Sequence, residues 1–347
     1  MKKQIAATGF TLLSLLLPLR AKAANLDFSQ MYVFGDSLSD QGNVFNATQG
    51  NFPPSPYFEG RFSNGFNWID YLAQDLGLTV NPLIGTAGTN FAFGGATTDQ
   101  ENTLSLTFPQ LSGLPALQQQ IATFTSLIPP TQTADPDALY VLWAGANDYL
   151  PTEGSFEPFE NPEITLGNLS TALTALTGVG ARNIMVVNLP QLGNTPIALF
   201  EEQQVPGTIN TLNNLSEAHN AGLSQLLNQF GNDFNTNLTN LNLISLEVNS
   251  LFSQATSGEL GFSNTTAPCF NFNAGSICNN PDEYLFWDAQ HPTTAAHRLV
   301  ANAALTALHP EDSTDSASVP ESSNGLVLLA FGFFATSLLL KRQLKKN

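Results

Sequence analysis

Basic residues are scarce in this chain. Its 347 residues include 11 Lys and Arg against 28 Asp and Glu. Eight of the eleven basic residues lie in the first 22 or the last seven positions, so the long central part has only Arg61, Arg182 and Arg298. Because this central part is strongly acidic, it repels nucleic-acid phosphates and anionic lipid headgroups, which argues against a nucleic-acid partner. A neutral or apolar small molecule remains an acceptable substrate.

Long apolar runs are also absent from the body of the chain and occur only at its two ends. At residues 1–23, Lys2 and Lys3 precede an apolar run from Ile5 to Leu17, and Ala21-Lys22-Ala23 forms a small-residue cleavage site. This pattern predicts a signal peptide and therefore export. An uncleaved anchor is the alternative, although the run is short for a membrane span of about 20 residues.

At the other end, residues 325–347 combine an apolar run from Gly325 to Leu340 with a basic end, as a short membrane stop does. The polar residues 311–324 before it are rich in Ser and Asp and are predicted to be a linker. Val319-Pro320-Glu321, the apolar run and the basic end together resemble the PEP-CTERM sorting signals of exported bacterial envelope proteins, with Ser322 in place of the usual second Pro.

That resemblance implies that residues 325–347 associate with a membrane at least transiently and are then processed. A permanent C-terminal anchor is the alternative. Either reading places the protein in the cell envelope, at the cell surface or outside the cell.

Cysteine is as scarce as positive charge. Cys269 and Cys278 are the only two, and no histidine is near them in the sequence. The spacing therefore gives no support to a metal site, and we expect neither a metal nor an organic cofactor. In an exported chain, two cysteines so close together are expected to form a disulfide.

The remaining residues, 24–310, show one composition throughout and no internal repeat, which predicts a single domain. Short, continuously apolar runs predict buried strands, and helical patterns fall between them. Such alternation indicates an α/β fold with a mostly parallel sheet, whose ligands bind at the carboxyl ends of the strands. The predicted strands are 31–34, 139–143, 183–189 and 241–248, and the predicted helices are 66–76, 110–127, 164–176, 209–230 and 292–308.

Ser37 is the candidate nucleophile. It follows the first predicted strand through Gly35-Asp36, and a glycine turn after a strand can expose a hydroxyl at the edge of the sheet. A serine in such a turn is more often structural, so Ser37 can act as a nucleophile only if a base lies beside it.

His291 is the candidate base. Pro292 is predicted to occupy the first position of the last helix, which keeps His291 extended at the helix mouth. Asp288, three residues earlier, is near enough to accept from Nδ1 and leave Nε2 free for the serine proton. Because the base must be neutral and imidazole ordinarily titrates near about pH 6.5, we expect activity to fall on acidification.

Several blocks of sequence resemble, in order, those of the GDSL or SGNH hydrolases, over about residues 30 to 308. They are Gly35-Asp36-Ser37-Leu38-Ser39, residues 60–65, residues 90–96, Gly145-Ala146-Asn147-Asp148 and Asp288 with His291. The resemblance implies a flavodoxin-like three-layer α/β/α sandwich with a mostly parallel five-stranded sheet.

The resemblance also implies an oxyanion hole formed by the Ser37 backbone N–H, a glycine N–H and the Asn147 side-chain amide. Counting along the block that begins at Asn90 favours Gly95 over Gly94, and the choice between them stays open. Asp36 and Asp148 are expected to fix loop shape, Arg61 to form an ion pair, and His219 and His297 to be structural or on the surface.

The sequence therefore predicts an exported serine esterase or lipase that hydrolyses a small-molecule or lipid carboxylic ester through an acyl-enzyme. A carbohydrate deacetylase of the acetylxylan type is an alternative with the same constellation. A non-catalytic binding protein displayed at the cell surface is a second one. Four aromatic residues after the nucleophile are expected to line an entrance, namely Phe45, Phe52, Tyr57 and Phe58.

Overall fold

The computed structural model describes residues 27–83, 87–152, 154–237, 240–272 and 274–309. The predicted signal peptide, linker and C-terminal sorting segment lie outside these residues. No helix in the described ranges combines the length and the apolar character needed to cross a membrane.

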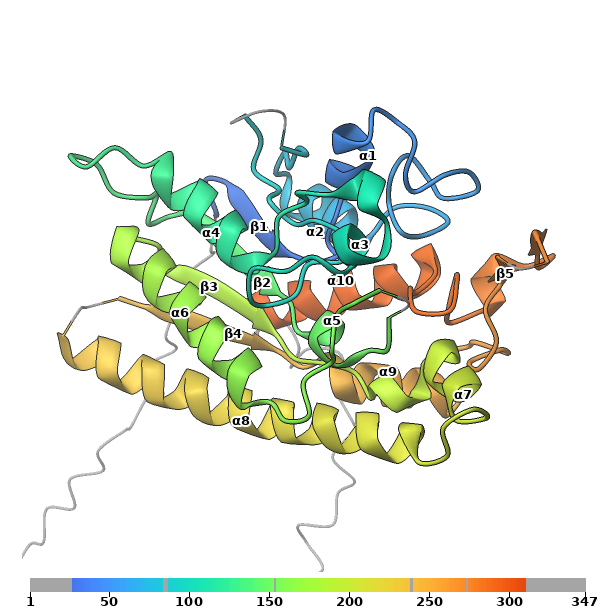
Figure 1. Cartoon of the computed structure of the whole chain (residues 1–347). Coiled ribbons are helices and arrows are strands. Elements are labelled where there is room, and N and C mark those ends of the chain that lie inside the picture. The colour runs from blue at the N-terminus through green and yellow to red at the C-terminus, as the bar shows by residue number, and fades with distance from the viewer. Residues whose placement is uncertain (1–26, 84–86, 153, 238–239, 273, 310–347) are drawn as a thin grey trace, which may run out of the picture.

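A parallel sheet of four strands forms the centre of the fold, in the order β1-β2-β3-β4 (Figure 1). The strands are β1 (Met31–Gly35), β2 (Leu139–Trp143), β3 (Asn183–Val187) and β4 (Asn242–Leu246). Every residue of β2 is buried, as expected of a central strand covered on both faces. All four strands lie within one or two residues of their predicted bounds, and the predicted fold class is confirmed.

The predicted fifth strand is replaced by a single bridge beside β1. Val33 N–H donates to Thr89 O at 2.9 Å and Phe91 N–H donates to Val33 O at 2.7 Å, in a parallel arrangement centred on Asn90. The pairing stays short because the chain turns at Gly94 and Gly95 just beyond it. The sheet of the described residues therefore has four strands and one bridged segment.

Helices cover both faces of the sheet, which completes the expected three layers (Figure 1). Because side chains alternate along a strand, Met31 and Val33 pack on one face, against α2 (Trp68–Leu76), α9 (Val248–Thr256) and α10 (Thr294–Leu308). Phe34 packs on the other face, against α4 (Leu117–Ser126), α6 (Glu163–Val179) and α8 (Thr208–Asn237).

Short elements form the loops around the carboxyl ends of the strands. They are α1 (Asn43–Ala47), α3 (Thr103–Thr107), η1 (Pro109–Leu111), α5 (Ala146–Tyr149), η2 (Leu192–Asn194), α7 (Pro196–Glu201), β5 (Phe270–Asn271), β6 (Ser276–Ile277) and η3 (Pro281–Glu283). The predicted disulfide between Cys269 and Cys278 is present and closes the antiparallel β5-β6 hairpin. The helix predicted over 110–127 begins only at Leu117, since Gly113 and Pro115 interrupt its first turns.

Candidate active site

Ser37 lies two residues beyond the end of β1, at the carboxyl edge of the sheet. Gly35 ends the strand with φ of 153°, and a Cβ there would collide with the Trp143 carbonyl of the neighbouring strand. Asp36 is buried, and its Oδ1 accepts the Leu38 N–H at 3.0 Å. The turn between β1 and Leu38 thereby places the Ser37 side chain above the sheet.

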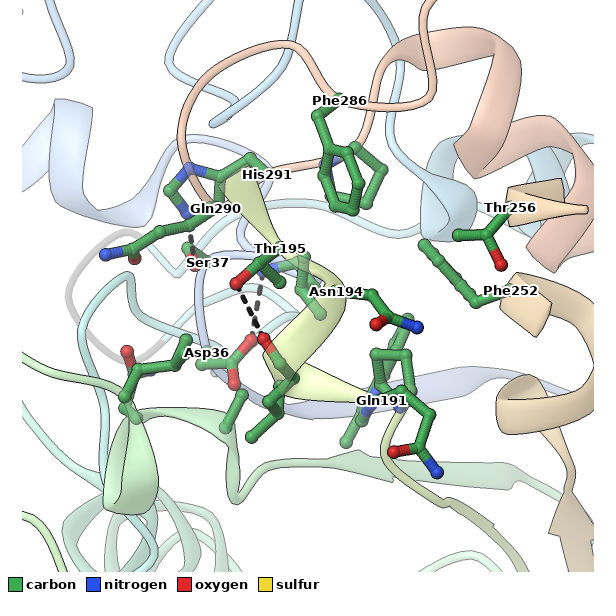
Figure 2. A pocket seen from close by; sticks show the side chains of 18 of the residues that line it. Asp36, Ser37, Gln191, Asn194, Thr195, Phe252, Thr256, Phe286, Gln290 and His291 are labelled. Atoms are coloured by element: carbon green, nitrogen blue, oxygen red, sulfur yellow. Dashed lines mark hydrogen bonds between the residues drawn. The ribbon is translucent and has the colours of Figure 1, made fainter. Parts of the chain in front are cut away.

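His291 and Asp288 meet Ser37 in a continuous line of hydrogen bonds. His291 Nε2 is 2.8 Å from Ser37 Oγ, although the two residues are 254 positions apart. On the other side of the ring, His291 Nδ1 is 2.7 Å from Asp288 Oδ2. Figure 2 shows the imidazole directed at the serine at one end of a pocket. The structure thus brings together the three residues selected from sequence.

Asp288 is held as an ionised acceptor. Its Oδ1 accepts the N–H groups of Gln290 at 2.8 Å and His291 at 2.7 Å, and its Oδ2 accepts the Tyr57 hydroxyl at 2.6 Å. Burial acts to raise the pKa of Asp288, but His291 and these hydrogen bonds hold that pKa below its usual value. The charged carboxylate can therefore fix the tautomer and orientation of the imidazole.

The loop that bears His291 differs in detail from the prediction. Helix α10 begins at Thr294 with Thr293 as its N-cap, so Pro292 precedes the helix and does not occupy its first position. The loop is held by the Trp287 N–H, which donates to His291 O at 2.7 Å, and by Asp288. His291 still lies at the helix mouth, but a closed turn positions it there.

Tyr57 is the contact that sequence reasoning missed. It comes from a loop 231 residues before Asp288, and its ring packs edge-on against Phe270 and Trp287. Burial and the neighbouring Asp288 raise the pKa of Tyr57, so its hydroxyl stays protonated and donates. Tyr57 does line a cleft at the site, as expected, whereas the walls of the two clefts that reach His291 do not include Phe45, Phe52 or Phe58.

Two of the three backbone N–H groups considered for an oxyanion hole are unengaged among the described residues. Among the described residues, neither Ser37 N–H nor Gly95 N–H has a hydrogen-bond acceptor, whereas Gly94 N–H donates to Asp40 Oδ2 at 2.9 Å. Asn147 Nδ2 donates to Ala96 O at 3.0 Å, which leaves its second amide hydrogen for another acceptor. Asn147 lines the same pocket as Ser37. This pattern favours Gly95 over Gly94 as an oxyanion donor.

An apolar pocket leads away from Ser37. The space between its walls, counted together with the open solvent at its mouth, is about 700 Å³. Figure 2 shows Ser37 and His291 at one end and Phe252 and Thr256 at the other. Its apolar walls are Leu38, Trp143, Ala146, Leu150, Pro190, Leu192, Phe252, Phe286 and Pro292.

A second and wider cleft, of about 1530 Å³, also reaches His291 and Asp288. Tyr57 and the β5-β6 hairpin form one wall, through Phe270 and Phe272, and α7 contributes Ile197 and Phe200. The candidate base thus borders both clefts, whereas Ser37 lines only the first.

The other charged residues near these loops have structural roles. Burial raises the pKa of Asp36 to about 7 and that of Asp40 and Asp148 to about 6. Asp148 accepts from Thr98 and Thr165, and Asp36 from Leu38, so both shape loops as expected.

Arg61 forms the expected ion pair, with Asp70, at 2.8 Å. His219 and His297 are both buried, and burial lowers their pKa to about 4 and about 3. In the part of the chain that the structure describes, no three His, Cys, Asp or Glu side chains gather so that they could hold a metal ion.

Known proteins resemble the chain over most of its length. It is 29% identical to the thermolabile hemolysin of Vibrio parahaemolyticus over 295 residues, which cover 80% of this chain and 63% of that protein. It is 28% identical to the phosphatidylcholine-sterol acyltransferase of Aeromonas hydrophila over 339 residues, covering 84% of this chain and 93% of the relative.

A solved structure of a lipolytic G-D-S-L family protein from Veillonella parvula is 15% identical, with a TM-score of 0.40 over 80% of this chain and 96% of that one. The family model described as GDSL-like Lipase/Acylhydrolase matches residues 31–304. The chain therefore belongs to the GDSL-like lipase/acylhydrolase family and is a serine hydrolase that acts on ester bonds.

Proposed function

We propose that Ser37, His291 and Asp288 form the catalytic triad of an esterase that cleaves lipid-like carboxylic esters. The observation that carries this proposal is the line of hydrogen bonds, 2.8 Å from Ser37 Oγ to His291 Nε2 and 2.7 Å from His291 Nδ1 to Asp288 Oδ2. A hydroxyl, a base and an orienting carboxylate in this order constitute the machinery of nucleophilic acyl transfer.

In the proposed reaction, Ser37 Oγ attacks the ester carbonyl carbon while His291 Nε2 takes the serine proton. The carbonyl oxygen becomes negative and accepts from Ser37 N–H, Gly95 N–H and the free amide hydrogen of Asn147. His291 then gives its proton to the leaving alcohol, and the acyl group remains on Ser37. Water, activated by the same imidazole, attacks the acyl-enzyme, releases the carboxylic acid and returns the proton to Ser37.

The walls of the pocket support an apolar acyl group. Trp143, Phe252 and Phe286 line the space that leads from Ser37, and burying an alkyl chain there is favourable by about 0.8 kcal/mol for each CH₂. An acetyl group would bury only its methyl against these walls, which ranks a carbohydrate deacetylase second. The name of the phosphatidylcholine-sterol acyltransferase also favours a lipid ester.

We further propose that the protein is exported to the cell envelope or beyond. The disulfide between Cys269 and Cys278 supports this location, because disulfides persist in oxidising compartments. The signal peptide and the C-terminal sorting segment stay predictions from the sequence.

A series of nitrophenyl esters with acyl chains of increasing length, together with acetylated xylan, tests the substrate class. We expect kcat/KM to rise from acetyl to longer chains and Ser37→Ala to abolish turnover of every ester. A preference for acetylated xylan would favour the deacetylase, and turnover above a few per cent in Ser37→Ala would refute the assigned nucleophile.

A further inference from the structure

Large apolar side chains are unevenly distributed over the surface. Seven are exposed in the described residues, and four of them lie on α7 with its following turn or on the β5-β6 hairpin. These four include the three most exposed: Phe272 at 72%, Val205 at 59% and Phe200 at 56%, with Ile277 at 48%. We call these four side chains the apolar tips. A gathering of this kind marks a surface that meets another apolar phase.

The apolar tips flank the wider cleft that ends at His291 and Asp288. Phe200 and Phe272 form part of its wall, and α7 and β5 lie at the same end of the molecule in Figure 1. A phase that covers the tips would therefore also cover the cleft that reaches His291 and Asp288.

Helix α7 and the β5-β6 hairpin, which carry the apolar tips, both contact the loop that bears His291. Ile197 N–H of α7 donates to Ala289 O at 2.8 Å, between Asp288 and His291. The hairpin is closed by the disulfide, and its Phe270 stacks on Trp287 with ring centroids 5.6 Å apart. The tips are thus held in a fixed relation to the site, as a docking surface requires.

The charges around the tips select the kind of surface. Glu201 lines the wider cleft, and the cleft wall contains no Lys or Arg among the described residues. Of the described arginines, Arg61 and Arg298 are paired with Asp70 and Asp75, and Arg182 lies just before β3, at the opposite edge of the sheet. A cleft with the carboxylate of Glu201 and no Lys or Arg offers no partner to anionic headgroups but tolerates a zwitterionic surface, whose outermost group is a quaternary ammonium cation.

We propose that the apolar tips dock the enzyme on a zwitterionic lipid surface of the phosphatidylcholine type, with Phe200 and Phe272 inserted among the lipids. This inference rests on the proposed function, because it places the ester-bearing phase at the mouth of the cleft that reaches the proposed base, His291. The partner is a lipid surface and not a second copy of the chain.

Local fluorescence quenching tests the docking without any turnover. Phe200→Trp and Phe272→Trp are made separately in the full-length Ser37→Ala chain and mixed with vesicles of phosphatidylcholine brominated in its acyl chains. Native Trp68, Trp143 and Trp287 are 0%, 1% and 2% exposed and give a constant background. Leu127→Trp is the matched control, since Leu127 is 37% exposed and ends α4 at the opposite edge of the sheet, where β2 begins.

We expect quenching of the tryptophans at 200 and 272, none at 127, and weaker quenching by anionic brominated vesicles at low salt. Equal quenching at all three positions, or none at 200 and 272, overturns the proposal, as does protection of the tips by dimer formation in solution. Because the quenching is measured on the inactive chain, the docking proposal can be refuted while the esterase assignment holds. The esterase assignment can likewise be refuted while the docking proposal holds.

A kinetic comparison uses the two apolar tips that lie outside the cleft wall. In the active chain, V205S together with I277S should lower hydrolysis of an ester carried in phosphatidylcholine vesicles about tenfold, as expected for the loss of apolar insertion. Hydrolysis of a soluble short-chain ester should be unchanged. An equal loss in both assays, or no loss in either, contradicts the role of the tips.

Discussion

The Tyr57 hydroxyl donates a hydrogen bond of 2.6 Å to Asp288 Oδ2, the same carboxylate oxygen that faces His291 Nδ1. The two donors share one acceptor, so the tyrosine draws negative charge away from the bond to the imidazole. Tyr57 is therefore a positioning residue for the proposed base, acting through Asp288.

Replacing Tyr57 by Phe should change the pH dependence of activity as well as its level. Without the tyrosine donor, Asp288 holds more negative charge towards His291 and stabilises the protonated imidazole, so the acid limb of kcat/KM should move to higher pH. Loss of one hydrogen bond to a charged group predicts a fall of about tenfold in kcat/KM at neutral pH. The measurement is a pH profile with a soluble nitrophenyl ester.

Tyr71→Phe is the matched control, because Tyr71 makes a hydrogen bond of 2.8 Å to Thr294 and does not touch Asp288. Its profile should coincide with that of the unmodified chain. An unmoved acid limb in Tyr57→Phe would show that Tyr57 only fills space.

Asn147→Ala tests the proposed oxyanion hole. The amide should bind the oxyanion more strongly than the ground-state ester, so kcat should fall by about 100- to 1000-fold with little change in KM. Circular dichroism and the thermal midpoint check that loss of the bond to Ala96 O leaves the fold intact. A raised KM with an unchanged kcat would assign Asn147 to substrate binding alone.

The strands were predictable from sequence because they are continuously apolar, and β2 has the predicted bounds of Leu139–Trp143. The three proposed catalytic residues were found because each follows a local pattern, the turn after a strand or Asp288 and His291 on one loop. The hydrogen bond from Tyr57 to Asp288 and the walls of the pocket follow from no local sequence pattern, since loops more than 200 residues apart bring Tyr57 to Asp288. The prediction of a fifth strand was wrong because two glycines turn the chain after Asn90.

Buried carboxyls and buried histidines should act on stability in opposite directions on acidification. Burial raises the pKa of Asp36 to about 7 and that of Asp40 and Asp148 to about 6, so the folded chain binds these protons more tightly than the unfolded chain. Stability from these carboxyls is fully present below their ordinary pKa of 3.8 and is lost as the pH rises through about 6 to 7. Burial lowers the pKa of His219 to about 4 and that of His297 to about 3, so stability from these two groups is lost as the pH falls below their ordinary pKa of 6.5.

Because the carboxyls and the histidines oppose one another, we expect the thermal midpoint to differ little between about pH 8 and about pH 5.5, the range in which a histidine base loses activity. Asp36→Asn should raise the midpoint at about pH 8 relative to that at about pH 5.5. A midpoint that falls on acidification in step with activity would mean that unfolding, and not protonation of the base, causes the loss of activity.

Opening the hairpin should cost stability. A disulfide between residues nine positions apart closes a short loop, for which about 2 to 3 kcal/mol of unfolding free energy is expected. The double variant C269S with C278S should show this loss in urea titrations, and dithiothreitol should lower the stability of the unmodified chain but not that of the variant. Equal stability of the two chains would show that packing of Phe270 on Trp287 suffices to hold the hairpin.

Covalent trapping tests most directly the claim that Ser37 is a nucleophile activated by His291. The chain is treated with a fluorophosphonate, and the adduct is located by mass spectrometry of peptides. We predict one adduct, on Ser37, whose formation is lost in Ser37→Ala and strongly slowed in His291→Gln. An adduct on another serine, or labelling of Ser37 at the same rate without His291, would contradict it.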